Sequence, residues 1–202
     1  MHAVAQTRVT GPGFSFRFGE RNVIGLSMAL RSEVSSYKIP GILAYRTISD
    51  LPRNQAINIP PAGLAGMVWG EIGAHYSRSN TDSDLHTAWG ISPKFLIGYE
   101  GFYTRAQSSF DYTQRQGDTV AFGSADWDYA LTMGNVTDPD NAKLRKQGTG
   151  MGLDAGFTWA QTAGDAAEGY AWRLGISLLD LGFVRFRNNA ERHHIAFDTL
   201  LT

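Results

Sequence analysis

The sequence contains no cysteine, and it is short of charged residues. Without cysteine the chain has neither a thiolate metal site nor a disulfide scaffold, which is compatible with an oxidising compartment. Charged residues make up 18% of the chain, below the roughly 25% of soluble domains. The formal net charge of -1 leaves no basic field for nucleic acid or an anionic membrane surface. We therefore expect no nucleic-acid partner.

Long apolar runs are also lacking, since no stretch approaches the roughly 18 residues that a transmembrane helix needs. The mean hydropathy of -0.23 still fits a barrel, because lipid-facing and lumen-facing residues average out along each strand. The first six residues, 1–6, show neither the basic nor the apolar region of a signal peptide. We expect a single domain over 1–202 that is a piece of a longer barrel.

What the sequence does contain is a period of two. Between Gly148 and Trp159, apolar Met151 and Phe157 alternate with small or polar Gly152 and Asp154, which predicts a strand. A similar alternation recurs at 14–18, 24–37, 68–76, 88–99 and 127–133, and again at 172–178. The first two of these segments form a predicted hairpin with a short turn.

Several segments interrupt the alternation. Residues 41–66 contain strand-breaking prolines and predict a long loop excursion. Polar loops are expected at 77–84 and 135–147, and 107–124 alternates only weakly. Pro93 lies inside a predicted strand, where it removes a hydrogen-bond donor, so we expect a bulge or a sheet edge near it.

The composition of the two strand faces favours a membrane protein. In a soluble sheet the face opposite the apolar one meets water and is rich in Lys, Glu, Thr and Gln, whereas here it is mainly Gly, Ser and Ala. The repeat of about ten alternating residues crosses a bilayer when tilted. We predict an all-β, antiparallel, membrane-spanning up-and-down β-barrel, or a large part of one, with about 8 or more strands. A soluble β-sandwich or lipocalin-like ligand-binding barrel is the alternative, because alternation is common to both.

Four segments also resemble a family, the functionally uncharacterised outer-membrane β-barrel proteins of Bacteroidota, which are broadly similar to long-chain fatty-acid transporter barrels. The resemblance rests on the order and spacing of Trp69–Arg78, His86–Gly98, Gly148–Trp159 and Ile176–Ala190. Members are about twice as long and carry a signal peptide, so this chain resembles their middle portion. The resemblance implies a location in the bacterial outer membrane, and it supplies no activity or catalytic residues.

Five charged or titratable residues fall on the side of the strands that faces away from lipid: Glu71, His75, Lys94, Asp154 and Arg173. A small lumen holds such groups only as hydrogen-bonded pairs. We expect a structural charge network, with a solute-selecting or gating ring as the alternative.

Asp180 departs from the alternation of its strand, because it is a charged residue in line with the apolar Leu178 and Trp172. Either a bulge near Leu179 turns its side chain inward, or the strand ends there and Leu181-Gly182 begins a turn.

Aromatic residues mark the ends of the predicted strands. Trp159 and Trp172 sit at the same height across a hairpin, and Tyr170 joins them. Together with Trp127 they predict the aromatic girdle of a membrane interface.

No motif predicts catalysis, a metal or a cofactor. His193 and His194 are adjacent, so on a strand they face opposite ways and cannot chelate together. Asp138-Pro-Asp140 lacks the frame of a calcium loop, and the glycines from Gly148 lead into a strand rather than into a helix N-terminus. Ser77, His75 and Asp82 lie near one another in sequence without an elbow motif. We expect a protein that is not an enzyme.

Three functions follow from these expectations. The first is a porin-like outer-membrane barrel, a passive channel or a transporter, whose partners are membrane lipid and a solute that is hydrophobic by analogy. The second is a non-transporting accessory subunit of an envelope or secretion machine, with 41–66 and 135–147 contacting a protein partner. The third is a soluble ligand-binding β-barrel.

Overall fold

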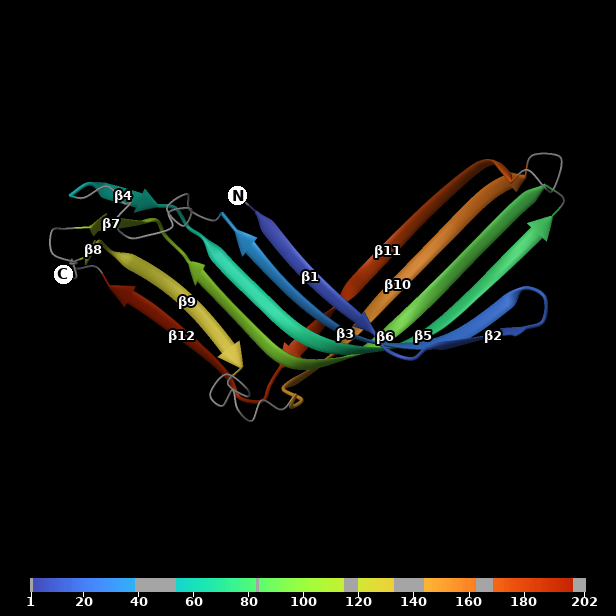
Figure 1. The fold of residues 1–202 in the computed structure, drawn as a ribbon, viewed down its shortest axis with the longest axis horizontal. Helices are drawn as coiled ribbons and strands as arrows, with labels where there is room; N and C mark the ends of the chain where they lie inside the picture. The colour runs from blue at the N-terminus through green and yellow to red at the C-terminus, as the bar shows by residue number, and fades with distance from the viewer. Residues whose placement is uncertain are drawn as a thin grey trace.

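A computed structural model describes residues 2–38, 54–82, 84–114, 120–132, 144–162 and 169–197. Every regular element in these ranges is a β-strand (Figure 1). The strands are β1 (Ala3–Thr10), β2 (Phe14–Phe18), β3 (Asn22–Tyr37), β4 (Ala56–Ile59), β5 (Gly63–Asp82), β6 (Leu85–Ala106), β7 (Phe110–Gln114), β8 (Val120–Phe122), β9 (Ala125–Thr132), β10 (Gly148–Thr162), β11 (Tyr170–Phe186) and β12 (Ala190–Phe197). The all-β prediction is confirmed. None of the described segments is a helix of the length and apolarity that crossing a membrane requires.

Nine of the strands form one antiparallel sheet with the order β1-β3-β5-β6-β10-β11. β2 pairs with the beginning of β3, and β1 pairs with the rest of it, so both lie along the same side of β3. In the same way β10 and β9 share one side of β6, and β11 and β12 continue one after the other beside them. The sheet therefore has six rows of strands. A separate sheet has the order β4-β7-β8.

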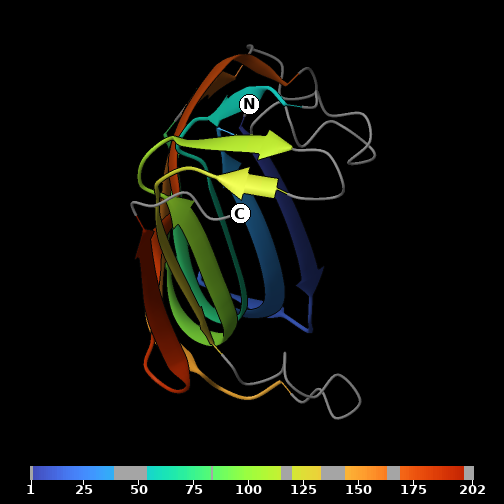
Figure 2. The same cartoon turned by 90° about the vertical axis from the view of Figure 1, so that its left-hand side faces the viewer.

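The large sheet is curled into a half-barrel with a bend across its middle (Figures 1 and 2). The bend divides it into two arms. We call one the apolar arm, made of β2, β10, β11 and residues 22–30, 70–82 and 85–97 of the three long strands. The other, the polar arm, is made of β1, β9, β12 and residues 31–37, 63–69 and 98–106.

The two faces of the sheet differ in their side chains. Ile72, Phe95 and Met151 are direct neighbours on one face, which we call the apolar face. The next row, Gly73, Lys94 and Gly152, lies on the opposite, polar face. Large side chains of the apolar face are exposed, including Met151 (67%), Phe157 (42%), Leu174 (63%) and Ile176 (73%). These residues do not form the core of a compact body.

Glycine is required where β10 and β11 approach each other closely. A Cβ atom built on Gly150 would lie 1.8 Å from the carbonyl oxygen of Phe183, and one on Gly182 would lie 2.4 Å from that of Met151. No side chain fits at such distances, since the obstructing atoms belong to the backbone. The glycines of this segment let the two strands pack against each other at the bend.

The strands are longer than the pattern of side chains predicts. The polar loop expected at 77–84 is wrong, because β5 continues to Asp82, which pairs with Leu85 at the start of β6. The loop expected at 41–66 contains β4, and β5 already begins at Gly63. Ladder hydrogen bonds join backbone groups, so pairing continues where the side chains turn polar. Residues 41–53 and Asp138–Asp140 lie outside the described residues.

Two further expectations need correction. The weakly alternating stretch at 107–124 supplies β7 and β8 of the small sheet, with β4 as the third strand. Pro93 causes no shift in register, since Gly73 pairs with Lys94 on one side of it and Tyr76 with Ile91 on the other. The register shifts lie instead between Val68 and Trp69, next to Asp154, and after Gln161.

Candidate functional site

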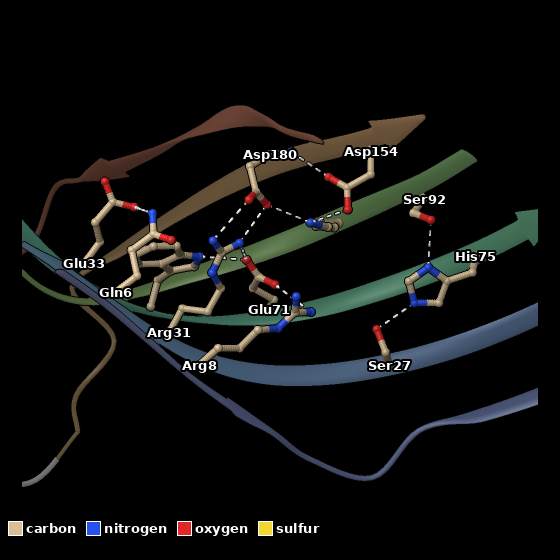
Figure 3. A network of polar contacts seen from close by, with 12 residues as sticks. Gln6, Arg8, Ser27, Arg31, Glu33, Glu71, His75, Ser92, Asp154 and Asp180 are labelled. Atoms are coloured by element: carbon tan, nitrogen blue, oxygen red, sulfur yellow. Dashed lines mark hydrogen bonds and ion pairs between the residues drawn. The ribbon is translucent and has the colours of Figure 1, made fainter. Parts of the chain in front are cut away.

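A network of charged side chains crosses the polar face (Figure 3). The Lys94 ammonium lies 2.5 Å from the Asp154 carboxylate and 2.9 Å from that of Asp180. The Arg31 guanidinium donates to both Asp180 oxygens, at 2.7 and 3.1 Å, and to Glu71 at 3.0 Å. These five residues come from five successive rows, β3, β5, β6, β10 and β11. Three of the five residues expected to line a lumen, Glu71, Lys94 and Asp154, are therefore brought together.

Asp180 reaches the network through a β-bulge. Leu153 pairs with Leu181 but Ala155 pairs with Leu178, so two residues, Leu179 and Asp180, stand opposite one. Asp180 has a φ of 57°, and its backbone N–H donates to the Asp154 carboxylate at 2.7 Å. The bulge expected near Leu179 is confirmed. The alternative turn at Leu181-Gly182 is absent, because β11 runs on through Phe186.

The contact between Arg31 and Asp180 identifies the polar face as the concave one. β3 and β11 are four rows apart, which is about 19 Å in a flat sheet. An extended arginine and an aspartate cannot bridge that distance, yet their charged atoms lie 2.7 Å apart. The sheet must curl toward this face, and the apolar face is its convex side.

The network is balanced in charge, and its centre is buried while Asp180 and Arg8 at its margins are 49% and 53% exposed. Only 6% of the Glu71 and Lys94 side chains and 11% of that of Arg31 are exposed. With Arg8, 3.8 Å from Glu71, three cations face three carboxylates. The Trp69 indole N–H donates to Glu71 at 3.0 Å, and Arg31 lies 5.0 Å from the Trp69 ring centroid. Because an unpaired charge here would be costly, each ion depends on its partners.

His75 and Arg173 do not join this network. The His75 ring is held between the Ser27 and Ser92 hydroxyls, at 2.6 and 2.8 Å, on the same concave face. The Arg173 guanidinium lies 5.7 Å from the centroid of the Tyr170 ring instead.

The residues that the sequence analysis did not single out are Arg31, Arg8 and Trp69. The alternation of β3 could have placed Arg31 on the polar face, because Arg31 is in line with Gly25, Ser27 and Ala29.

Two hollows open on the concave face beside the network. One, of about 300 Å³, adjoins the charged residues and reaches Gln6 and Glu33. The other, of about 440 Å³, lies in the polar arm, and its lining includes Ala65, Met67, Tyr103, Ala130 and Phe186. The charged residues in the lining of the second hollow are Glu33 and Glu191, and most of the others are apolar or glycine, so it is mainly an apolar surface.

The expected aromatic girdle is only partly assembled. The Trp159 and Trp172 rings meet edge to face, 5.4 Å apart. A register shift after Gln161 places Tyr170 opposite Thr162, and its ring contacts His86 at 6.2 Å. Tyr170 is thereby on the concave face and away from the two tryptophans.

Trp127 pairs with Ala106, in the other arm of the sheet, so it too lies apart from Trp159 and Trp172. The convex face holds further rings that the sequence analysis did not include in the girdle. Phe18, Tyr76 and Trp89 follow one another at 6.5 and 5.3 Å, and Trp89 pairs with Phe157. These rings and the two tryptophans of β10 and β11 form an aromatic row across one end of the apolar arm.

A second polar cluster lies in the polar arm around Asp128. Its carboxylate accepts from the Gln107 amide at 2.5 Å and lies 3.0 Å from Nδ1 of His194 and 3.5 Å from Arg192. Hydrogen bonds from Gln107 and then from His194 lower the pKa of Asp128. His193 turns the other way and stacks on Tyr129 at 4.9 Å. Within the described part of the chain, no three His, Asp or Glu side chains are grouped so that they could hold a metal ion.

The fold and the site together define a curled antiparallel β-sheet protein, ion-paired on its concave side and apolar on its convex side. The chain belongs to the family of unknown function DUF5723, whose family model matches residues 1–200. No curated protein and no solved structure matches it.

Proposed function

We propose that this chain forms part of the wall of a β-barrel in the bacterial outer membrane, and that the barrel takes up or passes a hydrophobic solute. The observation that supports this most is the convex face, where large apolar side chains such as Met151, Leu174 and Ile176 are all more than half exposed. Soluble proteins rarely leave so continuous an apolar surface bare. The resemblance to outer-membrane barrels of Bacteroidota points to the same location.

The concave face suits the lumen of such a barrel. The charges of the network are paired with one another, so they hold the curl of the wall and are not free to select an ion. The apolar hollow of about 440 Å³ beside them, with Met67 and Phe186 in its lining, is where a hydrophobic solute would sit.

A barrel of this kind needs more wall than the described strands supply. β1 and β2 on one side, and β11 and β12 on the other, each pair along one edge only. In lipid an open edge leaves backbone groups without hydrogen bonds, so both edges must be covered by further strands.

A second candidate is a barrel that transports nothing and serves as an accessory subunit of an envelope machine. The crossing of the concave face by Arg31 and Asp180 supports it, because a bridge between β3 and β11 obstructs a passage along the wall. The segments 41–66 and 135–147 would then be the contacts for a protein partner.

Two measurements test these proposals. The first is whether the full-length protein folds only with detergent and shows heat-modifiable mobility on a gel; a protein that stays folded in solution without detergent would instead be a soluble ligand-binding barrel. The second is reconstitution in planar bilayers. Conductance or solute flux supports the channel or transporter, and a folded but silent barrel that retains a protein partner supports the accessory subunit.

A further inference from the structure

We infer that only the apolar arm lies in the hydrocarbon layer, and that the polar arm stands outside it in water, although the same three strands run through both. This inference rests on the proposed membrane location and specifies which part of each strand lies within the membrane. The partner of the convex face of the apolar arm is lipid acyl chains.

The convex positions in the middle of the apolar arm are apolar, and its polar convex residues, such as Asn22, Arg78, Asn80 and Arg185, lie toward the two ends. Following paired residues from row to row, the apolar convex residues include Phe14, Phe16, Phe18, Ile24, Leu26, Met28, Leu30, Ile72, Trp89, Ile91, Phe95, Met151, Phe157, Trp159, Trp172, Leu174, Ile176, Leu178, Leu181 and Phe183. All of these side chains are exposed. Lipid acyl chains are the surroundings that such a surface matches.

The convex positions of the polar arm have a different composition. Ser32, Ser36 and Thr104 lie there, as do Glu191 and His193 on β12, whose side chains are 53% and 46% exposed. Exposed apolar residues lie there too, among them Val34 (38%), Leu64 (40%), Phe102 (42%) and Ile195 (47%), so this arm is mixed where the apolar arm is nearly uniform. An exposed carboxylate on a lipid-facing strand would be destabilising, so this arm suits water.

The length of the apolar arm fits a bilayer. Its convex band runs along β6 from Thr87, the partner of Trp159, to Ile97, the partner of Thr149. Those ten steps span about 33 Å, or about 25 Å when the strand is tilted by about 40°, which is the height of the apolar band in known membrane barrels.

Both borders of the band are marked. At one end stands the aromatic row with Trp89, Trp159 and Trp172. Arg78 pairs with Trp89 at the level of this row, and β5 continues beyond it with Asn80 and Asp82. At the other end Ile97 is followed across the sheet by Thr149 and then by Arg185. Aromatic rings followed by polar side chains are what a membrane interface requires.

The absence of cysteine makes a direct test possible in the full-length protein. Ile72→Cys and Val34→Cys are a matched pair, since both replace apolar convex residues of similar exposure, 41% and 38%. Each is labelled with a fluorescent probe in phosphatidylcholine vesicles and exposed to nitroxide-bearing lipid or to iodide. Ile176→Cys and Glu191→Cys repeat the comparison on β11 and β12, and Thr158→Cys is a concave control in the apolar arm.

Quenching by nitroxide lipid is expected to be at least about fivefold stronger at residues 72 and 176 than at 34 and 191, with the reverse order for iodide. Equal lipid quenching in both arms, or stronger quenching in the polar arm, would overturn the inference while leaving a membrane barrel in place. If flotation shows that the protein does not enter vesicles at all, the proposed membrane function itself is contradicted. Heat-modifiable mobility shows which variants are folded, and the second pair replaces any that is not.

Discussion

The Asp180 carboxylate accepts two hydrogen bonds from the Arg31 guanidinium, although 149 residues and three intervening rows of strands separate them. This contact links the two outer parts of the sheet across its concave face. It depends on a bulge in β11 that adds one residue and turns Asp180 inward. The curl of the wall and the irregularity in one strand are therefore parts of a single arrangement.

Lys94 is the cation that joins Asp154 to Asp180. Lys94→Met leaves Asp154 and Asp180 without their shared cation, and we expect it to lower the free energy of unfolding by about 3 kcal/mol, the low end for a broken buried pair, because both carboxylates are partly exposed. Urea titration in detergent micelles measures this. Arg173→Met, on the same face but outside the network, is expected to change it by about 0.5 kcal/mol or less. Similar losses for both variants would contradict the assignment.

The bulge at residue 180 has a backbone requirement separate from its charge. Asp180→Asn and Asp180→Val both remove the carboxylate, but only asparagine readily adopts a φ near the observed 57°. We expect the valine variant to be less stable than the asparagine variant by about 1–2 kcal/mol. The comparison uses the same urea titration, and equal stability of the two would show that the bulge relaxes.

Gly150 and Gly156 lie on the same strand and the same face, yet they differ in the room around them. A Cβ atom on Gly150 would meet the Phe183 carbonyl oxygen at 1.8 Å, whereas one on Gly156 would meet that of Ile176 at 3.7 Å. Gly150→Ala is expected to cost about 3 kcal/mol or more, since strands must separate to admit the methyl group. Gly156→Ala is expected to fold normally. Heat-modifiable mobility compares the two, and a normally folded Gly150→Ala protein would refute the close approach.

The effect on stability of a charge placed on the convex face tests whether this face contacts lipid. Ile176, 73% exposed, has little side-chain packing to lose. In water Ile176→Arg would change stability little, while in a bilayer it is expected to cost about 2–4 kcal/mol. Unfolding is therefore measured in vesicles, with Thr158→Arg on the concave face of β10 as the comparison. An unchanged midpoint for Ile176→Arg would place this face in water.

The cluster around Asp128 predicts a pH effect in the polar arm. Hydrogen bonds from Gln107 and His194 hold the pKa of Asp128 below its usual 3.8, so the folded state favours the carboxylate. Its stabilising contribution is full above pH 3.8 and is lost as the pH falls through the lower pKa of the folded state. Asp128→Asn is expected to remove this dependence from unfolding curves between about pH 2 and 5. Equal slopes for both proteins would contradict the role of Asp128.

The sequence predicts the strands and their faces because the polarity of each side chain indicates which face of the strand it lies on. Met151 and Gly152 already show the two sides of β10, and the same parity places Glu71, Lys94 and Asp154 together. It predicts strand ends poorly, since pairing such as Asp82 with Leu85 depends on the neighbouring backbone and is indifferent to side-chain polarity.

Single-residue changes in register decide the faces of Tyr170 and Asp180, and only the change at Asp180 was among the expectations. A bulge after Gln161 moves Tyr170 to the opposite face from Trp172, and the bulge beside Asp154 does the same for Asp180. Only the bulge at Asp180 can be recognised in the sequence, because it places a charged residue among the alternating apolar residues of the strand. The contact of Arg31 with Asp180 depends on curvature, which the alternation of one strand at a time does not encode.

With six rows, the outermost of the described strands run in opposite directions, β1 against β11. Any set of strands that joins them into an all-antiparallel ring must therefore be even in number. A single continuous segment that supplied those strands would therefore enter and leave at the same rim of the ring.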